Sequence, residues 1–260
     1  MKTDSTPQVS FSHYGGKPPE NYERYFVPTI GAAWATALLE VAGLSSGERV
    51  LDVACGTGIV TRRASELVGP EGFVAGLDVN PAMARCRPIR VTSIPCPDAS
   101  FDVVTCSLGL QFVPDRSAAM REIRRVLADG ERVAIGTVGA IPPVFEILAQ
   151  ALARHVKPEV AAFVRQVFSL HEPRELHDLA EGAGLRSVSV ESKPLRIMLP
   201  PPGEFLWQYV TSTPLAGPVG EIGDDERAAL ERDVTTAWRT FLDGDALRLD
   251  LDAVLTTARK

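Results

Sequence analysis

Short apolar runs alternate with segments of helical periodicity along the first half of the chain. Apolar and β-branched residues predict strands at residues 49–54, 73–77, 101–105 and 132–138. Between them, apolar residues at helical spacing predict helices at residues 29–42, 59–68 and 116–127. Because strands that alternate with helices form right-handed βαβ units, we predict an α/β fold with a doubly wound, mostly parallel sheet.

The pattern changes after residue 138, where helices that follow prolines replace the regular alternation. Helices are predicted at residues 145–153, 160–168, 175–183, 205–210 and 226–242, and strands at 187–190 and 251–257. The chain has no internal repeat, and its length suits one large domain with a sizeable embellishment.

Composition and charge narrow the function classes. The 260 residues are 45% hydrophobic and 23% charged, as in a globular protein, and the net charge of −6 gives no pull toward nucleic acid or anionic lipid. Met1–Ser10 lack the apolar region of a secretory signal, and no uninterrupted apolar run reaches the roughly 18–20 residues of a membrane span. We therefore predict a cytoplasmic protein without nucleic-acid or membrane partners. The four cysteines form no CxxC pair and no histidine cluster accompanies them, so we expect free thiols and no metal.

The segment Asp52–Gly58 lies between a predicted strand and a predicted helix, where backbone N–H groups and the helix dipole face a crevice. Gly56 and Gly58 let a ligand approach the main chain. Asp78 follows twenty residues after Gly58, at the end of the second strand, where a carboxylate accepts hydrogen bonds from ribose hydroxyls. Glycines also serve ordinary strand-to-helix turns, but the correctly spaced acid favours a nucleotide site.

The charge of this segment discriminates between nucleotides. A dinucleotide fingerprint needs a small residue at the position of Thr61, and its pyrophosphate would be repelled by Asp52. S-adenosylmethionine (SAM) carries an ammonium and a sulfonium, which the Asp52 carboxylate would stabilise directly or through water. We therefore favour SAM and keep an NAD-dependent oxidoreductase as the less favoured alternative.

Residues 50–58 (VLDVACGTG) and 76–83 (GLDVNPAM) resemble class I SAM-dependent methyltransferases of the ubiquinone/menaquinone-biosynthesis type. The resemblance covers residues 48–138, with further matches at 94–104, 109–115 and 120–127. Residues 19–25 (PENYERY) also resemble the N-terminal arm of such enzymes, in which a tyrosine lies against the cofactor. The resemblance implies a seven-stranded Rossmann-like sheet, SAM as the cofactor and S-adenosylhomocysteine (SAH) as the product.

Carried over to this chain, the resemblance assigns the cofactor-binding residues. Asp52, Ala54, Gly56, Thr57 and Gly58 would hold the methionine portion, Asp78 the ribose, and Val79 and Met83 the adenine, while Ser107 and Leu108 would lie near the methyl group and Tyr22 against the cofactor. For Met83 and Ser107 the alternative is an ordinary structural contact.

The chain departs from the family between Met83 and Ile94. The ten intervening residues are too few for the third helix, the third strand and the acidic turn that contacts the adenine amino group. Either the chain lacks this element or residues are absent from the sequence at Arg85–Pro88, and we predict the second.

A seven-stranded methyltransferase sheet does not require the segments 141–170 and 200–245, which we interpret as a cap over the carboxyl ends of the strands. We therefore expect six parts: an arm or lid (1–28), a SAM-binding core (29–140), a helical cap insertion (141–170), a core helix and strand (171–199), a second cap segment (200–245) and a final core strand (246–260).

Methyl transfer from a sulfonium is an in-line displacement that depends mainly on positioning in a dry pocket. The cap segments are rich in aromatic rings, namely Phe145, Phe163, Phe168, Phe205, Trp207, Tyr209 and Trp238. These rings suggest a small, apolar or aromatic acceptor with an O, C or N nucleophile, and they equally suit a core of the cap itself. If the reaction needs a base, His13 is the candidate to test first, because His155, His171 and His177 have positions typical of structural residues. A SAM-binding regulator without catalysis stays open, as does a homodimer.

Overall fold

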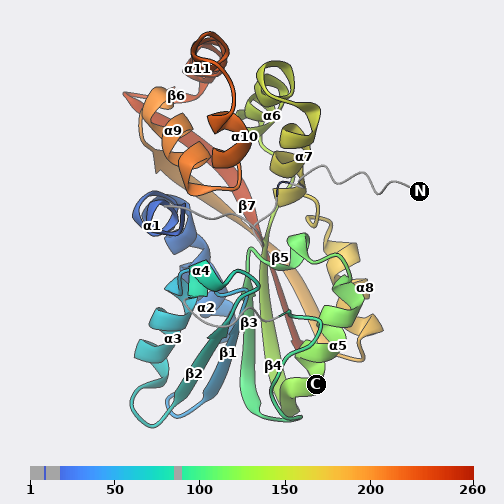
Figure 1. The fold of residues 1–260 in the computed structure, drawn as a ribbon. Helices are drawn as coiled ribbons and strands as arrows, with labels where there is room; N and C mark the ends of the chain where they lie inside the picture. Colours follow the sequence, from blue (N-terminus) through green and yellow to red (C-terminus); the bar gives the residue numbers. More distant parts are fainter. Residues whose placement is uncertain (1–8, 10–17, 85–89) are drawn as a thin grey trace, which may run out of the picture.

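The computed structural model describes Val9 and residues 18–84 and 90–260. Seven strands form one sheet in the order β2-β1-β3-β4-β7-β5, with β6 paired to β7 (Figure 1). Their bounds are β1 (Arg49–Val53), β2 (Phe73–Leu77), β3 (Phe101–Ser107), β4 (Leu127–Val138), β5 (Arg186–Leu199), β6 (Leu242–Asp243) and β7 (Ala246–Arg259). Strands β1 to β4 run parallel, and β7 runs antiparallel to its neighbours, so the predicted doubly wound, mostly parallel α/β sheet is confirmed.

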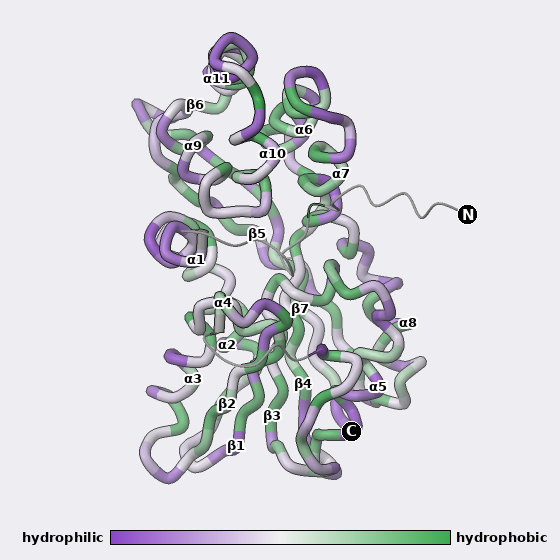
Figure 2. Tube along the Cα trace, viewed as in Figure 1, coloured by the Kyte–Doolittle hydropathy of each residue, from purple (hydrophilic) through white to green (hydrophobic). Residues whose placement is uncertain are grey.

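Helices cover both faces of the sheet and bury separate apolar cores. On one face α2 (Ala32–Ala42) and α3 (Ile59–Val68) contribute Trp34, Leu38 and Val60. On the other face α5 (Arg116–Val126) and α8 (Pro173–Gly182) contribute Ile123 and Leu176. Figure 2 shows the consequence as mainly hydrophobic central strands between more hydrophilic outer elements.

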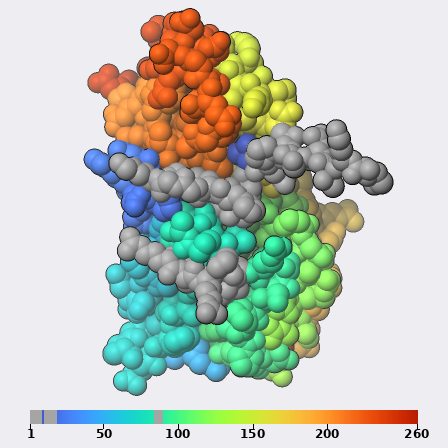
Figure 3. All heavy atoms as spheres, viewed as in Figure 1, coloured from blue at the N-terminus to red at the C-terminus, as the bar shows by residue number. Residues whose placement is uncertain are grey.

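A helical cap stands beyond the carboxyl ends of the parallel strands and forms the upper part of the molecule (Figures 1 and 3). Its helices are α6 (Pro143–His155), α7 (Pro158–Val167), α9 (Pro202–Ser212), α10 (Ala216–Gly220) and α11 (Asp224–Trp238), followed by the short η4 (Arg239–Phe241). Strands β5 and β7 pair with each other beyond the end of β4, because Leu199 still pairs with Leu247 while the pairing of β4 with β7 ends at Ala253. One hydrogen-bonded ladder therefore joins the cap to the core.

These two strands are longer than the pattern predicted. Residues 191–194 (ESKP) interrupt the apolar alternation of β5 with polar residues and a proline, which hid its continuation. In β7 the prediction missed residues 247–250, although the apolar and charged positions alternate there as in a half-exposed strand.

The described N-terminal segment is a continuous helix that begins earlier than the predicted 29–42. A short α1 (Pro18–Asn21) leads into a π-helix, η2 (Tyr22–Gly31), which continues into α2. Pro19–Ala42 is long and apolar enough to span a membrane, but half of its apolar window is buried, with Trp34 in the protein core. That burial is typical of the core helix of a globular fold.

Strand β2 lies at one edge of the sheet. Within residues 18–84 and 90–260, no strand occurs between β2 and β3, and only the short α4 (Pro81–Ala84) follows β2. The predicted omission at Arg85–Pro88 falls outside the described residues, as does Cys86. Cys96 and Cys106 are free thiols, as expected.

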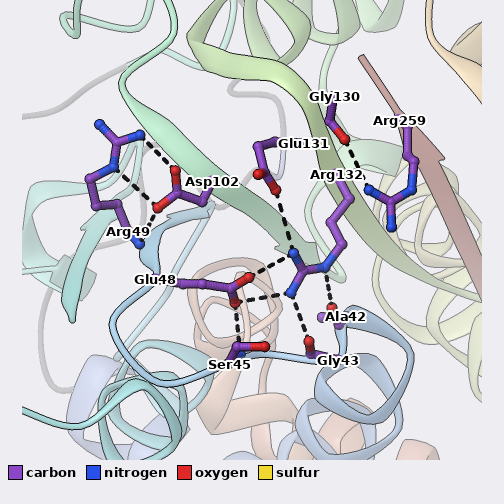
Figure 4. A network of polar contacts seen from close by, with 10 residues as sticks. All are labelled: Ala42, Gly43, Ser45, Glu48, Arg49, Asp102, Gly130, Glu131, Arg132 and Arg259. Carbon is purple, nitrogen blue, oxygen red and sulfur yellow. Dashed lines mark hydrogen bonds and ion pairs between the residues drawn. The ribbon is translucent and has the colours of Figure 1, made fainter. Parts of the chain in front are cut away.

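The amino ends of the strands are held by a charged network (Figure 4). Arg132 of β4 donates to both carboxylate oxygens of Glu48 at 2.8 and 2.9 Å and to the carbonyls of Ala42 and Gly43 at 2.6 and 2.7 Å. Partial burial acts to raise the pKa of Glu48, but hydrogen bonds from Arg132 and the Ser45 amide hold it below the usual value. The network connects the end of α2 to β1 and β4.

Candidate functional site

A cavity of about 1400 Å³ opens at the carboxyl ends of β1, β2 and β3, below the cap. Eight residues singled out from the sequence line it: Tyr22, Ala54, Gly56, Asp78, Val79, Met83, Ser107 and Leu108. Asp52, Thr57 and Gly58 belong to the same loop region but do not line the cavity. The fold therefore gathers residues from four separate segments around one space.

The loop after β1 has an unusual backbone conformation. Ala54, Gly56 and Gly58 have positive φ angles of 57°, 54° and 94°, in the left-handed region. Glycine adopts this conformation without penalty, whereas an alanine there carries local strain. The Ala54 methyl also meets the neighbouring loop, since a Cβ on Gly109 would collide with it. The loops after β1 and β3 therefore pack so closely that one must present a glycine.

Asp78 connects this loop to the end of β2. Its Oδ2 accepts a hydrogen bond from the Gly56 amide at 2.8 Å, and its Oδ1 accepts one from the Asn80 amide at 2.8 Å. The side chain is only 8% exposed, and burial raises its pKa above the usual value despite these hydrogen bonds. Each carboxylate oxygen has a second lone pair, so Asp78 can still accept hydrogen bonds from a ligand in the cavity.

Asp52 lies behind the cavity wall. It is 1% exposed, and its two oxygens accept hydrogen bonds from the Thr61 hydroxyl at 2.7 Å and the Thr105 hydroxyl at 3.1 Å. Burial raises its pKa to about 7, with the two threonines opposing the shift. From the sequence we expected the Asp52 carboxylate to face a ligand cation, but in the structure it faces the hydroxyls of Thr61 and Thr105. These hydrogen bonds connect the start of α3 to β1 and β3.

Tyr22 and Met83 approach the loop from outside the strands. A Cβ placed on Gly56 would lie 3.9 Å from Cε1 of Tyr22 and 3.9 Å from Cε of Met83. Tyr22 also stacks on Phe26, with ring centroids 4.5 Å apart. An aromatic ring and a thioether therefore flank the bare main chain of Gly56, next to the Asp78 carboxylate.

The sequence analysis missed the residues on the far side of the cavity. These are chiefly Phe112, Asp115 and Arg116, after β3, and Gln166 of α7. Asp115 caps α5 by accepting from the Ala118 amide at 2.8 Å, and its place at the end of the motif 109–115 was an available signal. Arg116 donates to Glu175 at 2.8 Å. Nothing in the sequence near Gln166 indicates the cavity, because only the packing of the cap brings α7 there.

His155, His171 and His177, the histidines in the part of the chain that the structure describes, lie away from the cavity wall. His13 lies outside the described residues. His155 pairs with Asp233 at 2.9 Å, His171 contacts the Phe168 carbonyl at 2.8 Å, and His177 lies near Glu181 on α8. No histidine within the described ranges lines the cavity.

The aromatic rings of the cap pack mainly on one another. Phe145 contacts the rings of Phe168, Phe205 and Tyr209, and Phe205 contacts Trp238, with centroids 5.1 to 6.4 Å apart. All five are buried and none lines the cavity. Of the two interpretations open from the sequence, the structure supports a core of the cap itself.

Sequence comparison with known proteins finds methyltransferases. Residues 51–135 match the family model of the methyltransferase domain. A ubiquinone/menaquinone biosynthesis C-methyltransferase of Cronobacter sakazakii is 33% identical over 154 residues, which are 52% of this chain and 61% of the relative. The corresponding enzyme of Pseudomonas paraeruginosa is 36% identical over 122 residues, 41% of this chain and 48% of the relative. The chain thus spans about half to three-fifths of the length of these curated relatives.

Solved structures share the fold. The YcgJ protein from Bacillus subtilis matches with a TM-score of 0.55 and 21% identity, over 88% of this chain and 98% of that one. Phosphoethanolamine N-methyltransferase 2 from Haemonchus contortus, solved with S-adenosyl-L-methionine, matches with a TM-score of 0.57 and 17% identity, over 93% of this chain and 56% of that one. At these identities the likeness establishes a Rossmann-like α/β fold.

Proposed function

We propose that this chain, whose residues 51–135 match the methyltransferase domain, is an enzyme that transfers a methyl group from SAM to a small-molecule acceptor. The main support is the position of the Asp78 carboxylate, which accepts a hydrogen bond from the Gly56 amide at 2.8 Å at the wall of the cavity. An acid at the end of the second strand, beside a loop with open main chain, suits the ribose of a nucleotide cofactor.

The residues around the cavity fit SAM by their chemistry. Asp78 is proposed to accept from the ribose hydroxyls, the main chain at Ala54 and Gly56 to face the methionine portion, and Val79 and Met83 to contact the adenine. Tyr22 is proposed to lie against the bound cofactor, and Ser107 and Leu108 to line the path near the methyl group. When bound, SAM supplies an electrophilic methyl group on a sulfonium.

Asp52 is proposed to act on the cofactor from behind the loop. Its charge would stabilise an ammonium over a short distance through the loop, while its hydrogen bonds to Thr61 and Thr105 keep the loop in place. Thr57 and Gly58, which do not line the cavity, are proposed to support the loop through their main chains. The Thr57 carbonyl accepts from Arg62 at 2.7 Å, and the Gly58 amide donates to the Cys55 carbonyl at 2.9 Å.

Positioning supplies the expected rate enhancement. The cavity of about 1400 Å³ exceeds the roughly 300–1,000 Å³ of common ligand pockets, which leaves space for an acceptor beside the cofactor. Phe112 and Leu108 favour an apolar body in that acceptor, and Arg116 and Gln166 can fix a polar group on it. Holding acceptor and methyl group in line away from water is enough for an acceptor that is already nucleophilic.

For the acceptor atom we take our proposal from the names of the relatives. The C-methyltransferases named above act in quinone biosynthesis by their names, so an electron-rich ring carbon is the first acceptor to test, before O and N nucleophiles. We propose a cytoplasmic location and a small-molecule partner, with neither nucleic acid nor membrane insertion, and keep a homodimer open. His13 stays the candidate base.

Calorimetric titration of the protein with SAM, SAH and NAD tests the proposal. We expect the parent protein to bind SAM and SAH, and Asp78→Ala to raise both dissociation constants at least about tenfold, because charge-assisted hydrogen bonds to the shared ribose are lost. The matched control is Asp129→Ala, which removes a 93% exposed side chain at the opposite end of the sheet and should leave both constants unchanged.

Tight NAD binding, or a SAM affinity that ignores Asp78→Ala, would overturn the proposal. A following screen for SAH formation with quinol-like and phenolic acceptors separates an enzyme from a SAM-binding regulator. A protein that binds SAM and turns over none of them supports the regulator.

A further inference from the structure

Two arginines in the first turns of α3 reach toward the N-terminal helix and make different contacts. Arg62 Nη2 pairs with Oε1 of Glu23 at 2.6 Å, and Arg62 Nη1 donates to the Thr57 carbonyl at 2.7 Å. Arg63 instead donates to the Ala32 carbonyl at 2.9 Å and to the Thr36 hydroxyl at 2.6 Å. Only Arg62 therefore touches both the π-helix η2 and the loop after β1.

Glu23 is the direct neighbour of Tyr22, whose ring lies against Gly56 at the cavity. Thr57 is the direct neighbour of Gly56 on the other side of that contact. The Arg62 guanidinium thus bridges the residue after Tyr22 and the residue after Gly56. The Arg62 amide donates to the Gly58 carbonyl at 2.9 Å, as the first hydrogen bond of α3, which fixes the place of Arg62 beside the loop.

The conformation of η2 supports a functional rather than a purely structural contact. A π-helix of ten residues is uncommon, and π-helical turns occur frequently at functional sites. Farther along, the segment is anchored by the buried side chains of Val27 and Ile30, and in α1 the side-chain amide of Asn21 donates to the Thr211 carbonyl of α9 at 3.3 Å. Arg62 and Glu23 are about half exposed, so their ion pair can open without unfolding the core.

We propose that Arg62 is a positioning residue that keeps the Tyr22 ring closed over the loop, so that release of a bound nucleoside requires the Glu23–Arg62 pair to open. The proposal rests on the proposed function only in that SAM and SAH occupy the cavity. Arg62 and Glu23 have no role in the cofactor site assigned above, and neither lines the cavity.

The test measures the dissociation rate of SAH by stopped-flow displacement, in the full-length parent protein and in Glu23→Gln, Arg62→Gln, the double variant and Arg63→Gln. An exposed ion pair contributes little, so we expect Glu23→Gln to speed dissociation about three- to fivefold. Arg62→Gln should have a larger effect, because it also loses the bond to the Thr57 carbonyl. The double variant should equal Arg62→Gln, since the pair acts as a unit.

Arg63→Gln is the control for general weakening of the helix contact. It should lower the melting temperature of the ligand-free protein and leave the SAH dissociation rate unchanged. Raising sodium chloride from 50 to 500 mM should speed dissociation from the parent protein but not from Glu23→Gln, because salt screens only an intact pair.

Two results would overturn the proposal. If Arg62→Gln and Glu23→Gln leave the dissociation rate unchanged while the parent protein binds SAH, the positioning role is wrong and the proposed function stands. If the parent protein does not bind SAH, the proposed function fails, and the role of Arg62 fails with it.

Discussion

The acidic side chains at the two ends of the parallel strands have different partners. At the amino ends, Arg49 pairs with Asp102 through two hydrogen bonds at 2.6 and 3.1 Å, beside the contacts of Arg132 with Glu48 (Figure 4). At the carboxyl ends, Asp52 is buried and accepts hydrogen bonds from Thr61 and Thr105, with no arginine or lysine among its described partners. The arginine partners lower the pKa of Asp102 and Glu48, whereas burial raises the pKa of Asp52 to about 7.

The difference distinguishes a stabilising network at the amino ends from the candidate site at the carboxyl ends. Paired charges at the amino ends connect the strands and the end of α2, and they do not line the cavity described above. The carboxyl ends carry a buried acid and two left-handed non-glycine residues, Ala54 and Leu108, at the cavity wall. Left-handed conformations also occur at Ala99 and Ser187, so strain alone does not mark the site. Strain, a buried acid and a cavity occur together at the carboxyl ends.

The strongest test of the comparison is the pH dependence of stability. The folded-state pKa of Asp52 is about 7 against 3.8 for the unfolded chain, so its contribution is present below about pH 4 and is lost as the pH rises to about 7. Between these pH values the free energy of unfolding of the parent protein should fall by about 3–4 kcal/mol because of this carboxyl, and Asp52→Asn should not show that fall. The asparagine can keep both threonine contacts, because the Thr105 hydroxyl can accept from it and donate to the Leu51 carbonyl.

Urea unfolding of parent and variant at four pH values between 4.5 and 7.5 measures this difference. Asp102→Asn is the matched control. Arg49 lowers the pKa of Asp102, so the stabilising contribution of this carboxylate is present throughout the measured range and is lost only at lower pH. The profile of Asp102→Asn should therefore stay parallel to that of the parent protein. Parallel pH profiles for the parent protein and Asp52→Asn would show that the Asp52 carboxyl is not shifted.

A smaller effect is expected at the opposite end of the sheet. Arg132→Met should lower the free energy of unfolding by about 2–3 kcal/mol, because Glu48 and two carbonyls lose a partly buried donor. SAH affinity should stay at the parent value. The control Arg196→Met removes an exposed ion pair with Asp250, in which the Arg196 side chain is 68% exposed, and it should leave the melting temperature unchanged. A loss of SAH affinity in Arg132→Met would show that the two ends are coupled.

The smallest effect concerns backbone strain. Gly130 at the amino ends has a φ of 84° with open space around it, so Gly130→Ala should cost about 1 kcal/mol. Ala54 already has this conformation, and Ala54→Gly should change the free energy of unfolding by less than about 0.5 kcal/mol, because relief of strain and added unfolded-state entropy oppose each other. Thermal unfolding measures both. An Ala54→Gly variant that gains as much as Gly130→Ala loses would mean that Ala54 is strained without compensation.

Short-range patterns in the sequence predicted the elements that position the site. The loop at Gly56 and the acid at Asp78 were found because parallel strands bring their carboxyl ends to one edge, so that spacing along the chain fixes proximity there. The arm tyrosine, Tyr22, was found through the resemblance of residues 19–25. The start of the N-terminal helix was missed, since a π-helix does not follow the period of 3.6 residues.

What the sequence by itself determined is the alternation of strands and helices, the loop after β1 and the acid after β2, because these depend on periodicity and on neighbours a few residues away. Only the tertiary structure decided that the Asp52 carboxylate turns to Thr61 and Thr105 instead of lining the cavity. The same holds for Gln166, which reaches the cavity from a separate cap helix. Asp52 and Thr105 are 53 positions apart in the sequence. The direction of a buried side chain is set by the packing of whole elements, which no local pattern records.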